Sequence, residues 1–468
     1  MSVDPVTKKG KRLSEVTVNF SGKNMTGFGG LAGFSEFIKR LGLARMLDGV
    51  AVSHRGQIYS ASRLMQTMLL GFVAGMDRMT DVASMRKDSV LLRILGWMNW
   101  PVQSTLTRFL GRFSETAVVS LQDVMGVILE IFRSGWRKFG GLHVDFDSHV
   151  RTVHGKTLEE AHVGYNPNKR GRPSYHPLMA FIGETKDILR GQFRPGNVRS
   201  SNGIVEFFQK CLKQLGWERL KWLVVRADSG FCELEFLQAL ESHGERLKYV
   251  IALKFFPHHT RRFANLTFTP IPGARHFEIA SYQSFDWLDW RKKATPENLN
   301  DPSAGRRIVV VRELIPEGGR KGLAGKQLKL FPDLKNYLYR AYVTSSKAPA
   351  VEVWRDYNGR ATCENVIKEA ICLGLDVNAT RKYFPNAAHF LLTLLACNLL
   401  NWYKEVAIGT VVKRMPKWVR QSILCVPAKL VASGRQLILK FPREWAWRGL
   451  LEKACELVEK WTLTPSYG

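Results

Sequence analysis

The stretch Gly-Leu-His-Val-Asp-Phe-Asp, residues 141–147, alternates between apolar and polar side chains from its second residue onward. Successive side chains of a β-strand point to opposite faces, so this alternation predicts a strand with one apolar face and one face that carries His143, Asp145 and Asp147. Two carboxylates on one strand face repel each other. Such a face is hard to explain as surface decoration, and it indicates a functional site on this strand.

Two further carboxylates lie in settings of the same kind. Asp228 closes the apolar run Trp-Leu-Val-Val-Arg-Ala-Asp at residues 222–228, which predicts a buried strand, and the Ser-Gly pair that follows predicts a turn. Glu364 lies in a segment whose apolar residues recur at helical spacing: Val366, Ile367, Ala370 and Ile371. A helical glutamate that faces the carboxyl edge of the sheet would complete a trio typical of metal-dependent phosphoryl transfer.

The composition indicates a folded protein with a polyanionic partner. The chain has 468 residues, enough for about three ordinary domains, and 45% of them are hydrophobic. Lys and Arg number 69 against 41 Asp and Glu, which gives a formal charge of +28 and favours nucleic acid as the partner. The seven cysteines include no C-x-x-C pair, so we expect reduced thiols.

No membrane partner is expected from the sequence. The longest apolar candidate, residues 387–400, is interrupted by His389, Thr393 and Asn398. The amino-terminal residues are basic and lack the apolar core of a signal peptide. We therefore expect a cytoplasmic protein.

The organisation of the chain changes twice. Helical periodicity dominates residues 31–138, a mixed α/β pattern begins at residue 140, and antiparallel strands fill much of the interval between Asp228 and Glu364. That interval is too long for one loop, so we infer an inserted β domain. The predicted divisions are a disordered basic tail (1–25), a helical DNA-binding domain (26–138), a mixed-sheet catalytic core (139–254 and 346–408), a β-strand insertion domain (255–345) and a basic C-terminal region (409–468).

The expected elements follow from the same patterns. In the core we predict strands at 141–152, 175–183, 189–193, 222–228 and 249–253, with helices at 204–215, 232–240, 362–374 and 386–406. In the insertion we predict strands at 263–268, 277–285, 307–314 and 337–344. A hairpin is expected about Ser433 and Gly434.

Taken in order, the motifs are Asp147 followed by a hydroxyl residue, the run Arg-Ala-Asp-Ser-Gly-Phe at 226–231, a β-rich insertion, and the spacing Tyr357-x-x-Arg360-x-x-x-Glu364 on a helix. This order resembles the DDE transposases of bacterial insertion sequences. More narrowly, it is similar to the cut-and-paste group whose ribonuclease H-like core is interrupted by a β-strand insertion domain. The similarity extends over roughly residues 30–450.

The resemblance implies roles for particular residues. It implies a catalytic triad that also binds the metal: Asp147, Asp228 and Glu364. It implies that Tyr357 and Arg360 hold the transposon end. The family pattern has a lysine seven positions beyond the glutamate, where this chain has Ile371, and Lys368, one helical turn after Glu364, is the candidate to replace it.

The chemistry is consistent with these residue types. Two divalent ions about 4 Å apart can activate the attacking oxygen and stabilise the leaving oxygen of a phosphodiester. Mg²⁺ or Mn²⁺ prefers oxygen ligands, and carboxylates from two strands and one helix supply them while leaving positions for water and phosphate.

Several residues admit two interpretations. Asp145 shares a face with Asp147 and competes with it as the first ligand, although the hydroxyl residue that follows favours Asp147. His143 is either a partner of the site or a structural histidine. Trp287 and Trp290 either stack on an unpaired base or pack within the insertion. The helix expected after Pro101 either reads a DNA groove or is an ordinary amphipathic helix.

Basic segments are candidates for DNA contact. The run Asn-Lys-Arg-Gly-Arg-Pro-Ser at 168–174 has the composition of a flexible arm that follows phosphates, with Lys169, Arg170 and Arg172 as the contacting residues, or else of a solvated loop. Residues 404–448 hold ten Lys or Arg against Glu405 and Glu444, a bias that suits contact with a DNA backbone.

We therefore expect a DNA transposase that binds the terminal inverted repeats of its insertion sequence and catalyses Mg²⁺-dependent phosphodiester hydrolysis and transesterification. Its partners would be double-stranded DNA at the transposon ends and the target, with at least a dimer on DNA, in the nucleoid. The alternatives are a catalytically inactive DNA-binding protein or repressor derived from a transposase, and a metal-dependent nuclease without strand transfer.

Overall fold

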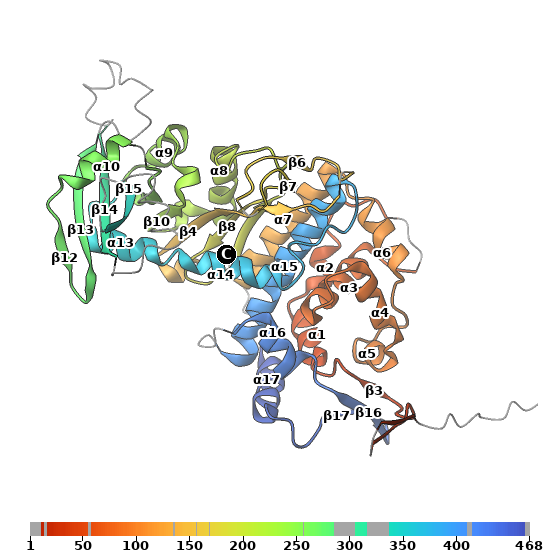
Figure 1. Cartoon of the computed structure of the whole chain (residues 1–468). Helices are drawn as coiled ribbons and strands as arrows, with labels where there is room; N and C mark the ends of the chain where they lie inside the picture. Colours follow the sequence, from red (N-terminus) through yellow and green to blue (C-terminus); the bar gives the residue numbers. More distant parts are fainter. Residues whose placement is uncertain are drawn as a thin grey trace, which may run out of the picture.

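The computed structural model describes residues 11–463 except for 14–15, 55–57, 134–135, 156, 168, 256, 285–304, 316–336 and 410–413. Figure 1 shows a sheet-containing part, in yellow, green and cyan, beside a group of red and orange helices. The blue C-terminal elements lie below α15 and reach the red N-terminal strands. Trp287 and Trp290 lie outside the described residues.

A nine-stranded mixed sheet runs through the first of these parts, in the order β12-β13-β14-β15-β11-β10-β4-β8-β9. The prediction of a mixed α/β fold is therefore confirmed. Its strands are β4 (Gly141–Ser148), β8 (Leu178–Ile182), β9 (Ile188–Gln192), β10 (Trp222–Ala227), β11 (Leu247–Ala252), β12 (Thr269–Ile271), β13 (Ala274–Ser284), β14 (Arg306–Leu314) and β15 (Tyr337–Thr344).

The middle of the sheet is parallel, and its register places the two aspartates. Strand β10 pairs in parallel with both β4 and β11, and Ala227 lies opposite Phe146. Both residues are fully buried, as expected for strands covered on two faces. The next positions along the two strands are Asp228 and Asp147. Their backbones therefore lie side by side at the carboxyl edge of the sheet.

The antiparallel strands between residues 255 and 345 widen this same sheet rather than forming a sheet of their own. Strand β15 pairs with β11, and β14, β13 and β12 follow outward. Alternate residues of these strands enter two separate apolar clusters, one of which contains Val250, Val309 and Val353. Helix α13 (Ala350–Asn358) covers this face, and α9 (Leu234–Glu241) and α10 (Pro257–Ala264) contribute to the other.

The strand predicted at residues 263–268 is wrong. Residues Pro257–Ala264 form helix α10, and Phe263 is its fully buried anchor. The Phe263 ring lies 5.3 Å from that of Phe255 and 6.0 Å from that of Tyr339. A short apolar run does not distinguish a strand from one face of a helix, and here packing on β15 selects the helix.

The segment predicted to be helical before residue 138 does consist of helices. Three of them are capped by a side chain that accepts a backbone N–H of the first turn; the capping residues are Ser60, Asp88 and Ser114. The helices are α1 (Leu31–Arg40), α2 (Leu43–Leu47), α3 (Ala61–Ala74), α4 (Met79–Ser84), α5 (Ser89–Ile94), α6 (Gln103–Leu110) and α7 (Glu115–Phe132).

Helix α15 (Tyr383–Ile408) joins the helices to the sheet. It packs against α3, α7, α17 and β9. Of the described helices it alone is long and apolar enough to cross a membrane, yet 89% of that window is buried inside the fold. Its apolar surface is therefore accounted for by core packing.

The remaining predicted helices are present. They are α8 (Ile204–Leu215), α9, α14 (Ala361–Ile371) and α15. A small second sheet, ordered β5-β7-β6, joins Arg151–Thr152, Pro173–Tyr175 and His162–Val163.

The two ends of the described chain meet. Strand β3 (Met25–Thr26) pairs with β16 (Ala428–Ser433), which forms the predicted hairpin with β17 (Gln436–Lys440). Helices α16 (Pro416–Val419) and α17 (Arg448–Lys460) flank this hairpin in the chain. Strands β1 (Lys11–Leu13) and β2 (Val16–Val18) also pair, within the range for which the sequence predicts a disordered tail.

Candidate active site

Asp147, the last aspartate of β4, meets a cation across the sheet edge. Its Oδ2 lies 3.0 Å from Nη2 of Arg360, and its Oδ1 accepts the backbone N–H of Ser148 at 2.8 Å. The thiol of Cys363 donates weakly to the same Oδ2 at 3.6 Å. Cys363 itself is buried.

The surroundings of Asp147 act on the pKa of its carboxyl group in opposite directions. Burial raises the pKa of its carboxyl group, the Arg360 guanidinium opposes that rise, and the nearby charge of Asp228 adds to it, so the net pKa lies above its ordinary value. Two carboxylates close together at a mostly buried edge favour a positive group between them. At present Arg360 supplies that positive charge.

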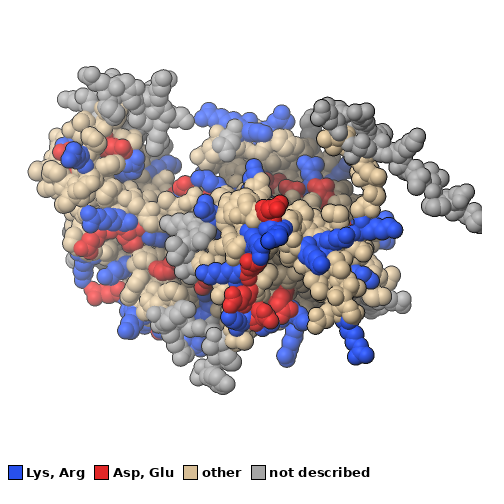
Figure 2. Space-filling view, turned by 90° about the horizontal axis from the view of Figure 1, so that it is seen from below, with Lys and Arg blue, Asp and Glu red and all other residues tan. Residues whose placement is uncertain are grey.

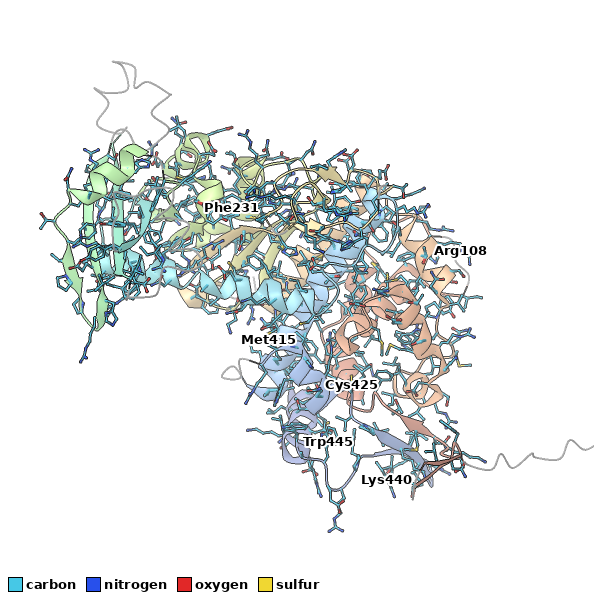
Figure 3. All side chains as sticks on the ribbon, viewed as in Figure 1. Arg108, Phe231, Met415, Cys425, Lys440 and Trp445 are labelled. Carbon is cyan, nitrogen blue, oxygen red and sulfur yellow. The ribbon has the colours of Figure 1, made fainter. Side chains whose placement is uncertain are left out.

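Asp228 follows β10 directly, and its carboxylate is held by the turn that comes next. Its Oδ1 accepts the backbone N–H of Gly230 at 2.9 Å. A side chain at Gly230 would approach this Oδ1 and Ser200 at 3.1 Å, so the turn packs tightly. Phe231, labelled in Figure 3, closes the turn with a fully buried ring.

Arg360 lies between two helices rather than within one. The sequence predicted Tyr357, Arg360 and Glu364 on a single helix, but α13 ends at Asn358 and α14 begins at Ala361. A Cβ at Gly359 would lie 2.5 Å from a guanidinium nitrogen of Arg226. The break therefore coincides with the close approach of Arg226 to the backbone.

Burial disfavours the charge of the Arg360 guanidinium, but Asp147 and further neighbours outweigh it and raise its pKa. The guanidinium also donates to the carbonyl of Phe146 at 3.3 Å. Its side chain is only 8% exposed. Arg360 thus points into the sheet edge and ties α14 to the end of β4.

Glu364 lies on the open side of the same guanidinium. Its Oε1 is 4.0 Å from Nη1 of Arg360, and its side chain is 58% exposed. Lys368, one turn further along α14, is exposed, and so is Ile371. The structure therefore places the candidate replacement lysine on the exposed side of α14 with Glu364.

Tyr357 closes the other side of the group. Burial raises the pKa of its hydroxyl to about 12, with Arg360 opposing and Asp228 adding to the rise. Its ring lies 4.4 Å from that of Tyr342 on β15. Tyr357 is therefore a half-buried residue between the widened sheet and the aspartates.

Asp145 is fully engaged elsewhere. It is fully buried, and it receives Nε of Arg226 at 2.6 Å and Nη2 at 3.0 Å. Burial opposes the charge of Arg226, but the bonds to Asp145 and the charge of Asp356 outweigh it and raise its pKa. Since both oxygens of Asp145 are bound, this geometry favours Asp147 as the ligand.

His143 bridges two carboxylates away from the aspartate edge. Its Nδ1 lies 2.6 Å from Glu184 and its Nε2 2.8 Å from Asp356. Burial of the ring opposes protonation, but the hydrogen bonds to Asp356 and Glu184 prevail and raise the pKa to about 9. The structure thus gives His143 a structural partner set, one of the two roles considered from the sequence.

A hydrogen-bonded chain behind the aspartates was not predicted. His176 approaches Ser148 Oγ at 3.0 Å and the Val198 carbonyl at 2.8 Å, and Ser148 Oγ meets Ser200 Oγ at 2.9 Å. Burial lowers the pKa of His176. A neutral ring would donate to the carbonyl through Nδ1 and accept from Ser148 through Nε2. The pairing of β8 with β4, which places His176 beside Ser148, was the missing signal.

The candidate metal ligands are not gathered around one point. No group of three His, Cys, Asp or Glu side chains within the described ranges is arranged to hold a metal ion. The donor set is nonetheless made of hard oxygens, and Asp147 already holds a cationic group at 3.0 Å. The residues therefore fit a divalent ion once Arg360 gives up its contact with Oδ2.

The candidate arm and the candidate groove helix are solvent-accessible. Lys169, Arg170 and Arg172 are exposed between β6 and β7, and Asn168 lies outside the described residues. On α6 and just beyond it, Arg108 and Arg112 are exposed and donate to the carbonyls of Ser104 and Ser53. Lys and Arg side chains project over much of the face in Figure 2.

Not every basic residue between positions 404 and 448 is available for DNA. Lys404 is buried and pairs with Glu369 at 2.7 Å. Arg420 donates to the carbonyls of Phe72, Val73 and Cys372. Both side chains are therefore used within the fold. Lys404 is paired with a carboxylate and Arg420 with backbone carbonyls, so neither can also bind a phosphate.

The search of curated proteins found no match. A piggyBac transposase synaptic complex with hairpin DNA is similar at 13% identity and a TM-score of 0.40, covering 84% of this chain and 78% of that chain. The Drosophila P element transposase strand transfer complex is similar at 12% identity and a TM-score of 0.23, covering 88% and 94%.

A family description covers nearly the whole sequence. The family "Transposase DDE domain group 1" matches residues 8–462. This match agrees with the order of acidic motifs on β4, β10 and α14. The chain therefore belongs to the DDE transposases of domain group 1.

Proposed function

We propose that this chain binds the terminal inverted repeats of a bacterial insertion sequence, hydrolyses a phosphodiester bond at each end and joins the freed 3′ ends to target DNA. The observation that carries the proposal is the side-by-side position of Asp147 and Asp228 at the ends of parallel strands, with Arg360, just before α14, in contact with Asp147 and Glu364 of α14 beside that guanidinium. The chain would act on DNA in the cytoplasm, as at least a dimer.

The strands β9-β8-β4-β10-β11 are the part that we assign to a ribonuclease H-like core. They comprise an antiparallel series of three strands followed by two strands parallel to β4. Strands β12 to β15 would correspond to the inserted β domain, fused to the core along β11. This assignment supports the function because it puts both aspartates at the centre of the core.

Two divalent ions, Mg²⁺ or Mn²⁺, would be held by Asp147, Asp228 and Glu364, and they would supply activation of the attacking oxygen and stabilisation of the leaving oxygen. The chain itself fixes the orientation of the aspartates. Ser148 N–H holds one oxygen of Asp147, and Gly230 N–H holds one oxygen of Asp228. The exposed Glu364 is free to turn inward from α14.

Arg360 and Tyr357 have the residue types and positions to bind a DNA phosphate near the cut. The Arg360 guanidinium is charged and mostly buried beside Asp147, so an incoming phosphate would compete with that carboxylate for its N–H groups. Lys368 and the arm residues Lys169, Arg170 and Arg172 would contact the backbone further out. These residues position DNA, whereas the acidic trio carries the chemistry.

The test is Asp228→Asn in the full chain, assayed with DNA from the element's own ends and Mg²⁺ or Mn²⁺. Cleavage and joining should fall below detection, while binding to the ends survives, because the substitution removes a charge without changing the shape of the turn. The matched control is Asp356→Asn, which removes a carboxylate of similar exposure that contacts Arg226 and His143.

Each other result would indicate a different function or a different site. Wild-type binding without any cleavage identifies an inactive DNA-binding protein or repressor. Cleavage without joining, even when pre-nicked ends are supplied, identifies a nuclease that lacks strand transfer. Cleavage that persists in Asp228→Asn contradicts the proposed site.

A further inference from the structure

The hairpin β16–β17 carries basic side chains that form no ion pair with any acidic residue that the structure describes. Residues 428–448 contain five basic residues and a single acidic one, Glu444. The basic residues are Lys429, Arg435, Lys440, Arg443 and Arg448. All five are exposed, and within the described residues only Arg448 forms an ion pair, with Glu452.

The strand register sets two of these charges directly against each other. Lys429 on β16 is the cross-strand partner of Lys440 on β17. Residues directly opposite in an antiparallel pair point to the same face, and like charges there destabilise the pair. On the other side of Lys429, the register pairs it with Met25, which is 58% exposed and offers no negative charge.

The tip of the hairpin continues the same pattern. Gly434, with φ of 58°, makes a tight turn and leaves Arg435 exposed at its apex. Leu437 and Ile438 are 59% and 38% exposed. Strand β17 is an edge strand, because β16 is its only neighbour in the sheet. The hairpin is therefore an open ribbon with basic residues at its tip and base.

Figure 1 places this hairpin below the red and orange helices and away from the nine-stranded sheet. Figure 3 labels Lys440 on the hairpin and Trp445 on the segment leading to α17. The Trp445 ring lies 5.8 Å from that of Trp447, and its indole N–H donates to the Ser422 carbonyl at 3.1 Å. This packing anchors the base of the ribbon while its tip stays exposed.

We propose that the β16–β17 hairpin is a docking surface for duplex DNA outside the cleavage site, with Lys429, Lys440 and Arg435 contacting phosphates. This inference rests on the proposed function and names one surface that the substrate would cover. Beyond its pairing with β3 at Ala428 and Lys429, the hairpin is a two-stranded ribbon, of a width that the major groove admits. A polyanion would relieve the repulsion between the opposed lysines. An anionic membrane surface is the competing partner, because Leu437 and Ile438 are exposed beside these charges.

The experiment compares two double variants of the full chain. Lys429→Gln with Lys440→Gln removes the opposed pair, and Lys213→Gln with Lys221→Gln removes the same charge elsewhere. Lys213 lies in the last turn of α8 and Lys221 immediately precedes β10, so Lys221 lies at the sheet edge opposite Asp147 and Asp228 and Lys213 lies in the segment that leads to it. Binding to a labelled duplex of arbitrary sequence is measured in EDTA over a series of salt concentrations.

The hairpin variant should weaken binding and reduce the slope of log K against log salt by about 1.8, roughly 0.9 for each lost phosphate contact, whereas the control keeps the wild-type slope. The variant Lys440→Glu is the control for loss of folding, because a glutamate at this position would lie opposite Lys429 and form an attractive pair with it. It should weaken DNA binding while the midpoint of thermal unfolding does not fall.

Equal slopes for the two double variants would overturn the hairpin proposal even if the wild type binds and cuts DNA. A wild type that shows no salt-dependent binding to the duplex would remove the proposed function as well. Vesicles of phosphatidylserine and phosphatidylcholine provide the other arm. Vesicle binding that depends on Lys429 and Lys440, with DNA binding unaffected by them, would assign the surface to lipid and refute this proposal.

Discussion

Asp145 and Asp147 are two positions apart on β4 and lie on the same face, yet they have different surroundings and different proposed roles. Asp145 is bound at both oxygens by Arg226, whereas Asp147 keeps a carboxylate at the edge beside Asp228. Removing one partner of a buried ion pair leaves the other uncompensated. Substitution by Asn should therefore lower mainly the stability of the fold at Asp145 and mainly the cleavage activity at Asp147.

Asp145→Asn should destabilise the fold by about 3 kcal/mol, since Arg226 loses its charged partner. Asp147→Asn should cost less stability, because only one oxygen of Asp147 contacts a guanidinium and the substitution also removes the repulsion by the charge of Asp228. It should nevertheless abolish cleavage. Urea unfolding and end cleavage, measured on the same preparations, check both statements. A stable, inactive Asp145→Asn beside an active Asp147→Asn would reverse the assignment.

His143 should make the stability of the protein depend on pH above neutrality. Its pKa is raised from 6.5 to about 9, so its stabilising effect is complete below pH 6.5 and is lost as the pH rises through 9. His143→Gln should remove on the order of 2–3 kcal/mol at about pH 6 and little at about pH 10. Urea unfolding of both proteins at these two pH values gives the difference, and parallel pH profiles would contradict it.

At this scale the sequence selects three candidate acids but not the contacts that hold them. Asp147, Asp228 and Glu364 could be selected because each ends a strand or lies on a helix with clear periodicity. The bonds of Asp145 to Arg226 and of Asp147 to Arg360 join residues far apart in the chain, and no local pattern encodes such pairs. The position of His176 behind Ser148 depends likewise on the pairing of β8 with β4.

One buried carboxylate ties three elements together. Asp187, in the turn before β9, is fully buried and accepts bonds from Arg133 at the end of α7 and from Asn401 and Trp402 on α15. Arg133 also pairs with Glu405 at 2.7 Å. Burial opposes the charge of Arg133, but Asp187 and Glu405 outweigh it and raise its pKa. Asp187 therefore joins α7 and α15 to the edge of the sheet at β9.

Asp187→Ala should destabilise the protein by about 3–5 kcal/mol, because it leaves the buried guanidinium of Arg133 without its nearest partner. Asp187→Asn, which keeps oxygen and nitrogen at the same place, should cost less. Glu456→Ala, which removes an exposed ion pair on α17, should leave the unfolding midpoint unchanged. Thermal and urea unfolding test all three. A midpoint for Asp187→Ala equal to that of Glu456→Ala would show that the cluster contributes nothing.

Elements with a single strong pattern could be predicted, and elements decided by packing could not. Strands β4 and β10 and helices α8 and α15 lie where alternation or helical spacing placed them. Helix α10 was mistaken for a strand. The break between α13 and α14 could not be predicted, because it coincides with the close approach of Arg226, on strand β10, to Gly359.

At the scale of the whole molecule, composition predicted a basic protein but not which charges face outward. Lys404 and Arg420 are used within the fold, whereas the hairpin residues Lys429, Arg435 and Lys440 remain exposed. Net charge counts both kinds alike. Only the arrangement of α14, α15 and the C-terminal elements separates residues that support the fold from residues available to a polyanion.

The pairing of β3 with β16 also bears on how the protein is made. Residues 25–26 leave the ribosome long before their partner strand, residues 428–433, has been made. Helix α1 likewise waits for α17 and α15, against which it packs. A nascent chain interrupted anywhere before these segments therefore exposes the apolar sides of its earliest helices, and premature stop products should be recognised by chaperones and proteases as unfinished.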